Sequence, residues 1–154
     1  MTDLSSYKAQ SGTLVPVWTL EIQTVPEDTD KILDAVMEVH PLSFGRYQRN
    51  ASISAVGMET TQPEAGSTTT SHIEGFEAGN TATYPMVELK ISIERNPATL
   101  EKVMDAVLYV HHYEEPVVYL REDWASRAKY NPRSENPNRW WNDGRGMPNR
   151  IEPR

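Results

Sequence analysis

The chain has 154 residues, enough for one domain of ordinary size, and it contains no cysteine. Disulfide bonds and thiolate metal sites are therefore excluded. Residues 1–120 carry 7 basic against 17 acidic side chains, whereas residues 121–154 carry 8 against 5, so an acidic body precedes a basic tail. The acidic body argues against general nucleic-acid binding, because phosphate contacts need a basic face.

The sequence carries no sign of a membrane span or an export signal. No apolar run approaches the ~20 residues that cross a bilayer. The start, MTDLSSYKAQSG, lacks the basic flank and the apolar stretch of a signal peptide. We therefore expect a cytoplasmic protein that does not bind membranes.

An internal repeat with an offset of 71 residues organises the chain. DKILDAVMEVHP at 30–41 matches EKVMDAVLYVHH at 101–112, and six of the twelve positions are identical. The same offset pairs Pro26 with Pro97. It also pairs two apolar patterns with a period of two, namely Trp18, Leu20 and Ile22 with Leu89, Ile91 and Ile93.

Each copy predicts a strand followed by a helix. Apolar residues at every second position are typical of a strand with one buried face, and a proline suits the first turn of a helix. After the first helix, residues 43–56 predict a strand with a bend near Gly45, and after the second, residues 115–120 predict a short strand. Two such split β-α-β units predict an α+β, ferredoxin-like fold, in which a four-stranded antiparallel sheet carries both helices on one face.

The remaining segments flank or separate the two copies. The predicted parts are an N-terminal extension (1–14), a domain (15–121) made of two copies (15–56 and 84–121) with a long loop or hairpin between them (57–83), and a C-terminal extension (122–154). The stretch EDWASRAKY predicts one or two helical turns, with irregular chain beyond Asn131. Trp124, Trp140 and Trp141 are costly to leave in water, so we expect the tail to pack along a surface of this or another subunit.

Three motifs, taken in order, resemble a known family. They are Gly45-Arg46-Tyr47, the series Gly57, Thr60, Pro63 and Gly66, and Val110-His111-His112-Tyr113-Glu114-Glu115. Over roughly residues 15–121 the chain resembles the CutA divalent-cation-tolerance family, and more closely the CutA-like domain inserted in YqfO-type metalloproteins. It departs from them at His112, where relatives have proline. It also lacks the flanking halves that hold the YqfO-type metal centre, so their hydrolase-like activity is not expected here.

The resemblance implies a fold, an assembly and a type of ligand. CutA-like domains share the ferredoxin-like fold with PII signalling proteins and typically form homotrimers. In the PII group, small ligands bind in clefts between subunits, and the long loop after the second strand reaches a partner protein; residues 57–85 occupy that place here. CutA relatives are linked to copper and other divalent cations, so the cofactor that the resemblance implies is a divalent metal, copper or zinc.

The segment after the second helix holds most of the candidate site residues. Four of them are candidate metal ligands, because imidazoles and carboxylates bind zinc and copper: His111, His112, Glu114 and Glu115. Adjacent residues of an extended segment point to opposite sides, so His111 and His112 share an ion only if the backbone turns. The alternative for His111 is a helix-end role, because His40 occupies the same place in the first copy. Candidate ligand-binding residues are Arg46, Arg49, Tyr113 and Glu114, the arginines as anion contacts.

No catalytic residues are predicted. Ser, His and Asp do not recur at a recognisable spacing, and GFEAG and NDGRG lack the strand-to-helix context of a phosphate loop. We expect a non-enzymatic PII/CutA-like oligomer that binds a small ligand or a divalent metal at subunit clefts and acts on a partner through residues 57–85 or the tail. A copper- or zinc-binding cation-tolerance protein and an accessory subunit of an enzyme are the alternatives. The arginines and tryptophans of the tail also fit a single-strand binder, but the acidic body argues against nucleic acid.

Overall fold

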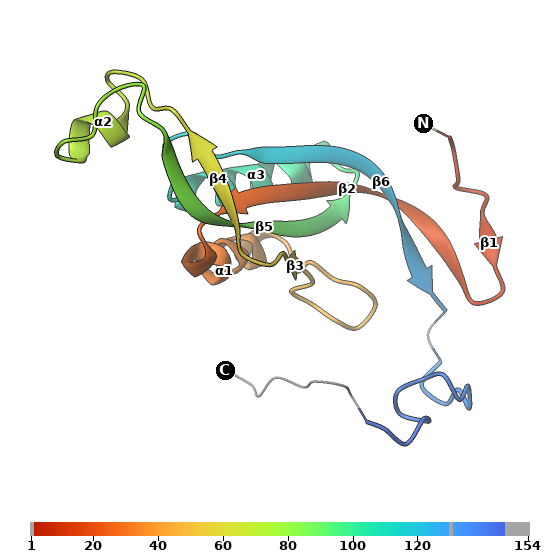
Figure 1. Ribbon diagram of the computed structural model, residues 1–154. Helices are drawn as coiled ribbons and strands as arrows, with labels where there is room; N and C mark the ends of the chain where they lie inside the picture. Colours follow the sequence, from red (N-terminus) through yellow and green to blue (C-terminus); the bar gives the residue numbers. More distant parts are fainter. Residues whose placement is uncertain (1, 130, 147–154) are drawn as a thin grey trace.

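The computed structural model describes residues 2–129 and 131–146 (Figure 1). A 3₁₀ turn at Pro26–Asp28 precedes α1. The other elements, in chain order, are β1 (Lys8–Ala9), β2 (Gly12–Thr24), α1 (Thr29–Val39), β3 (Ser52–Ile53), β4 (Gly57–Thr61), α2 (Thr68–His72), β5 (Ala82–Glu94), α3 (Pro97–Val110) and β6 (Val118–Ala128). No helix in these ranges has the length and apolar character needed to cross a membrane.

The sheet has the strand order of a ferredoxin-like fold. β2 lies between β5 and β6, and β3 pairs with the far side of β5, so the order across the body is β6-β2-β5-β3. All of these pairings are antiparallel; Leu20, for example, is opposite Ile91 on one side and Leu120 on the other. Two short additions bring the total to six strands, because β1 pairs with β2 and β4 pairs with β5. The predicted α+β, ferredoxin-like class is confirmed, with two strands more than expected.

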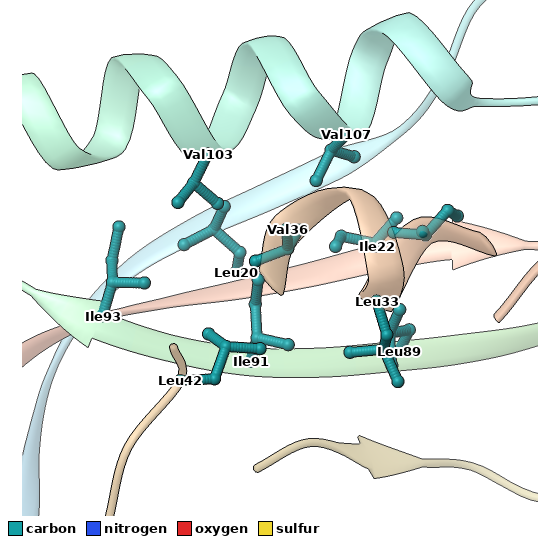
Figure 2. Packing of buried hydrophobic residues seen from close by; sticks show 11 residues of the cluster. Leu20, Ile22, Leu33, Val36, Leu42, Leu89, Ile91, Ile93, Val103 and Val107 are labelled. Atoms are coloured by element: carbon teal, nitrogen blue, oxygen red, sulfur yellow. The ribbon is translucent and has the colours of Figure 1, made fainter. Parts of the chain in front are cut away.

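The core lies between one face of this sheet and the two long helices (Figure 2). Every second residue of β2 and β5 faces the helices, which is the alternation that the repeat predicts. The fully or almost fully buried members are Leu20 and Ile22 from β2; Leu89, Ile91 and Ile93 from β5; Ile32, Leu33 and Val36 from α1; Val103 and Val107 from α3; and Leu42. Burying each such side chain contributes about 1.5–3 kcal/mol to stability.

The helix starts follow the sequence signals in two different ways. Pro97 is the first residue of α3, and the Asn96 side chain accepts hydrogen bonds from the backbone N–H groups of Ala98 (2.9 Å) and Thr99 (3.3 Å). Pro26 instead opens the 3₁₀ turn that leads into α1. The predicted proline position is therefore exact for α3 and one turn early for α1.

The predicted strand at 43–56 is wrong for most of its length. Leu42 and Arg49 adopt positive φ angles of 48° and 57°, which turn the backbone out of the extended conformation. Between them the chain forms a tight turn in which Phe44 and Tyr47 bridge each other. Only Ser52–Ile53 pairs with β5. Local backbone turns of this kind leave no periodic signal in the sequence.

The predicted helical turns at 122–130 are also wrong, because β6 continues through this stretch to Ala128. β6 pairs with β2 along its whole length, from Val118 opposite Ile22 to Ala128 opposite Gly12. The short strand expected at 115–120 is thus the first part of a longer one. β2 runs across residue 14 and β6 runs across residue 121, and the two extension boundaries stay predictions.

Residues 57–86 form a two-stranded arm that leaves the body of the molecule (Figure 1). In this arm, β4 pairs with the first half of β5, from Gly57 opposite Met86 to Thr61 opposite Ala82, and α2 lies in the connection between the two strands. The long segment between the repeats is therefore a hairpin excursion, one of the two forms that the sequence allows.

Candidate functional site

A cavity of about 920 Å³ lies where the arm meets the segment that follows α3. β4 and β5 contribute Met58, Glu59 and Tyr84 to its lining, and α2 contributes Thr68 and His72. The opposite part of the lining comes from the body, chiefly from residues 112–117. The cavity is within the ~300–1,000 Å³ of typical small-molecule sites, so it is large enough for an organic ligand.

Glu114 fastens the arm to the body. Its Oε2 accepts hydrogen bonds from the backbone N–H and the hydroxyl of Thr68, both at 2.8 Å. Thr68 is the first residue of α2, so its N–H has no partner within that helix. These two bonds lower the pKa of Glu114 below its ordinary value, with the backbone bond as the larger cause. The side chain therefore stays ionised at neutral pH and accepts both hydrogen bonds from Thr68 there.

Tyr113 is a residue of the cavity lining whose hydroxyl is unsatisfied. Its Oη is buried and has no hydrogen-bond partner within residues 2–129 and 131–146. Burial is the main cause that raises the pKa of this phenol well above its ordinary value, and the nearby Glu59 carboxylate raises it further. Glu59 is thus close enough to act on the phenol, although the two groups do not meet in hydrogen-bonding geometry. The hydroxyl therefore stays protonated at neutral pH.

His111 is held by hydrogen bonds at both ring nitrogens. Nε2 is 2.8 Å from the carbonyl oxygen of Gln23, and Nδ1 is 3.1 Å from the backbone N of Tyr113. The first contact requires the proton on Nε2, which leaves Nδ1 as the acceptor. Desolvation lowers the pKa of His111, so the neutral ring is favoured. These contacts belong to a helix-end role.

The other two metal candidates are His112 and Glu115. The His112 side chain is 67% exposed, and its Nδ1 is 3.7 Å from Oδ2 of Asp28. Glu115 lines the cavity and has no ion pair among the described residues. Although His112, Glu114 and Glu115 all border the cavity, no three His, Asp or Glu side chains in the described part of the chain converge in a way that could hold a metal ion.

The predicted anion contacts lie away from the cavity lining. Arg49 pairs with Asp34 through Nη1 and with Asp30 through Nη2, the latter at 3.3 Å, so its charge is already matched. Arg46 lies in the turn between Phe44 and Tyr47. Of the four predicted ligand-binding residues, the fold brings Tyr113 and Glu114 to the cavity and does not bring the two arginines there.

Several lining residues escaped the sequence analysis. Glu59, Tyr84 and Thr68 come from the arm, where single polar or aromatic residues carry no periodic signal. The strand pattern around Leu89 could have been extended upstream, which places Tyr84 and Met86 on one face of β5. His72, which the sequence offered only as a lone histidine, also lines the cavity.

Comparisons with known proteins agree with this architecture. No protein-family model matches the chain, and no curated protein matches it. A Bacillus cereus protein related to NIF3 matches over 73% of this chain and 27% of its own, with 16% identity and a TM-score of 0.54. The chain has a CutA/PII-like, ferredoxin-type fold. It corresponds to about a quarter of the longer Bacillus protein.

Two CutA1 structures are also similar to the chain. CutA1 from Oryza sativa has 15% identity and a TM-score of 0.47, over 71% of this chain and 81% of its own. The divalent ion tolerance protein CutA1 from Ehrlichia chaffeensis has 10% identity and a TM-score of 0.49, over 75% of this chain and 84% of its own. The finer likeness to the domain of YqfO-type metalloproteins stays a prediction.

The predicted ligands do not fit a divalent-metal centre within one copy of this chain. Both ring nitrogens of His111 are engaged, and Glu114 uses one carboxylate oxygen to hold α2. A copper or zinc ion needs several donors at fixed angles around it. A metal on this segment would therefore need ligands from a second chain.

Proposed function

We propose that this protein is a non-enzymatic, PII/CutA-like regulator that binds a small ligand in the cavity and signals its presence through the arm. The observation that carries the proposal is the position of Glu114. It borders the cavity and at the same time accepts both hydrogen bonds from Thr68 that attach the arm to the body. A ligand beside Glu114 touches the body and the arm together.

The construction of the cavity supports this coupling. Met58, Glu59 and Tyr84 belong to the arm, whereas Tyr113 and Glu115 belong to the body. A ligand that contacts both sets binds one orientation of the arm better than others, and such a difference in affinity shifts the population of arm orientations. A partner protein that recognises the arm then senses whether the cavity is filled.

We further propose that the protein is a homotrimer. The CutA/PII-like fold supports this assembly, and so does the outer edge of β6, which pairs with no other strand in the described part of the chain. Unpaired strand edges promote association between chains. Light scattering coupled to size-exclusion chromatography should give three times the 17.5 kDa of one chain. A monomer in solution would contradict this assembly.

Ligand binding is tested with three probes that share a phenyl-ethyl body: 2-phenylethylamine, 2-phenylethanol and 3-phenylpropanoate. Saturation-transfer NMR should detect binding of at least one of them. Met58→Trp should abolish the signal, because Met58 lines the cavity and its side chain is largely exposed, so a larger ring fills space without disturbing the core. Val56→Trp, at an equally exposed position outside the lining, is the control. Binding of none of the probes would contradict the proposal.

A further inference from the structure

The cavity carries a negative charge that the protein does not neutralise. Glu59, Glu114 and Glu115 are among its lining residues, whereas no lysine or arginine is. Glu114 is held in the ionised form by its bonds to Thr68. Neither Glu59 nor Glu115 has a cationic partner within residues 2–129 and 131–146.

Some other acidic groups of the body, in contrast, are paired with arginine. Glu21 on β2 pairs with Arg121 at 2.6 Å, and Arg49 matches two aspartates of α1. Carboxylates left without a counter-ion in a concave site raise the local concentration of cations and repel anions. The charge therefore argues against phosphate-bearing or carboxylate ligands in this cavity.

Besides hydroxyl, amide and imidazole side chains, the lining contains apolar and aromatic ones. Met58, Ile73, Met86 and Val117 offer hydrocarbon and thioether surface, and Tyr84 and Tyr113 offer rings. Aromatic faces attract cations through their quadrupole, and methionine adapts to irregular apolar groups. The lining thus suits a ligand that has both a positive charge and an apolar body.

We propose that the cavity binds a small organic cation, an ammonium compound with an apolar body. The charged end lies near the carboxylates of Glu59 and Glu115. The apolar end lies against Met58 and Tyr84. This inference rests on the proposed function, because it names the ligand class of the same cavity.

An ammonium group also fits where a metal ion does not. A divalent metal requires several converging donors, which the described residues lack. An ammonium group is satisfied by one or two carboxylates, a hydroxyl oxygen and aromatic faces at less exacting angles. A cavity of about 920 Å³ is moreover far larger than an inorganic ion needs.

The three phenyl-ethyl probes test the inference because they differ mainly in charge. In calorimetric or NMR titrations at pH 7.5 and low salt, 2-phenylethylamine should bind about tenfold more tightly than 2-phenylethanol, and 3-phenylpropanoate should show no binding. The factor corresponds to one partly solvated charge pair. Raising the NaCl concentration should weaken the binding of the amine and leave the binding of the alcohol unchanged.

Two charge-removing variants locate the site. Glu59→Gln and Glu115→Gln should each lower the affinity for the amine about three- to tenfold and leave the affinity for the alcohol unchanged. Glu101→Gln, at an exposed position of α3 outside the lining, is the matched control and should bind like the wild type. The melting temperature of each variant shows that it is folded.

The outcomes separate this inference from the proposed function. The cation inference is overturned if the alcohol or the carboxylate binds as tightly as the amine. It is also overturned if both glutamine variants leave the affinity for the amine unchanged. In either case, the proposal that the cavity binds a ligand still stands. If no probe binds to the folded wild type, the proposed function fails and the inference fails with it.

Discussion

His111 repeats, 71 residues later, the hydrogen bonds that His40 makes at the end of the first helix. Nδ1 of His40 is 3.0 Å from the backbone N of Leu42, and Nδ1 of His111 is 3.1 Å from that of Tyr113, each two residues ahead. Nε2 of each ring reaches a neighbouring strand, at Glu94 Oε2 (2.9 Å) for His40 and at the Gln23 carbonyl (2.8 Å) for His111. Both rings therefore stabilise the turn that follows a helix, and this is their role in the fold.

His111→Ala should lower the free energy of unfolding by about 1–3 kcal/mol at neutral pH, because two hydrogen bonds of a half-buried ring are lost and their partners are left unsatisfied. Desolvation lowers the pKa of His111 in the folded state below 6.5, so the unfolded chain binds protons first as the pH falls. Stability of the wild type should therefore decline below about pH 6.5, and the alanine variant should decline less.

Urea unfolding between pH 5 and pH 8 measures this effect. His112→Ala is the control, because its side chain is mostly exposed, and it should change stability by less than ~0.5 kcal/mol. Identical pH slopes for the wild type and His111→Ala would contradict the buried, neutral ring.

Val36→Ala and Val107→Ala should each lower the free energy of unfolding by about 2 kcal/mol, because each removes two buried methyl groups and leaves a small cavity. The two residues are equivalent in the repeat and are both 0% exposed in the same cluster (Figure 2). Val39, on the same helix as Val36, is 44% exposed. Val39→Ala should therefore lie within ~0.5 kcal/mol of the wild type in thermal or urea unfolding. Equal losses at Val36 and Val39 would show that the core lies elsewhere.

The repeat makes the helix-facing core predictable, because burial imposes a period of two on Leu20 and Ile22 and a helical period on Val36 and Val107. His40, the twin of His111 in the repeat, also favours the helix-end alternative for His111, and the two ring contacts of His111 fit that alternative. The sequence did not predict the turn after α1. Leu42 and Arg49 have positive φ there, and leucine and arginine rarely adopt this conformation, so these residue types give no signal of the turn. The sequence did not predict the length of β6 because its partner strand is β2, about 100 residues earlier in the chain.

The candidate site is harder to predict than the core. Tyr113, Glu114 and Glu115 were singled out as one short motif, and they do border the cavity. Glu59 and Tyr84 come from strands of the arm, and only the folding of the hairpin brings them to that motif. Residues that come together from distant segments have no fixed spacing in the sequence by which they could be recognised.

Gly12→Ala should destabilise the end of the β2–β6 pairing by about 1–3 kcal/mol, the usual cost of overpacking. A Cβ at this position would lie 2.7 Å from the backbone oxygen of Arg127, which cannot move without separating the strands. Hydrogen exchange of the last amides of β6 should become faster. Gly57→Ala is the matched control on β4, because its nearest atom, the Met86 oxygen, would be 3.8 Å away. Unchanged exchange in Gly12→Ala would indicate that the two strand ends are not paired as described.

Glu114→Ala should free the arm without unfolding the body. It removes both bonds to Thr68, so the amides of α2 and the neighbouring loop should exchange faster, while those of β2 and β5 within the sheet keep their protection. Thr68→Val removes only the hydroxyl bond and should have a smaller effect in the same direction. Because the folded-state pKa of Glu114 lies below 4.5, the contact is complete above pH 4.5 and is lost as the pH falls through the lowered value.

Mass-spectrometric hydrogen exchange at neutral pH distinguishes this attachment from a general loosening. Glu115→Ala is the control, since Glu115 borders the same cavity and has no bond to the arm within the described residues. If Glu114→Ala leaves the exchange of α2 unchanged, the arm is held by its strand pairing alone. A ligand in the cavity would then have no route to the arm through Glu114, because regulation requires that the bound and free states differ in a contact that the arm can lose.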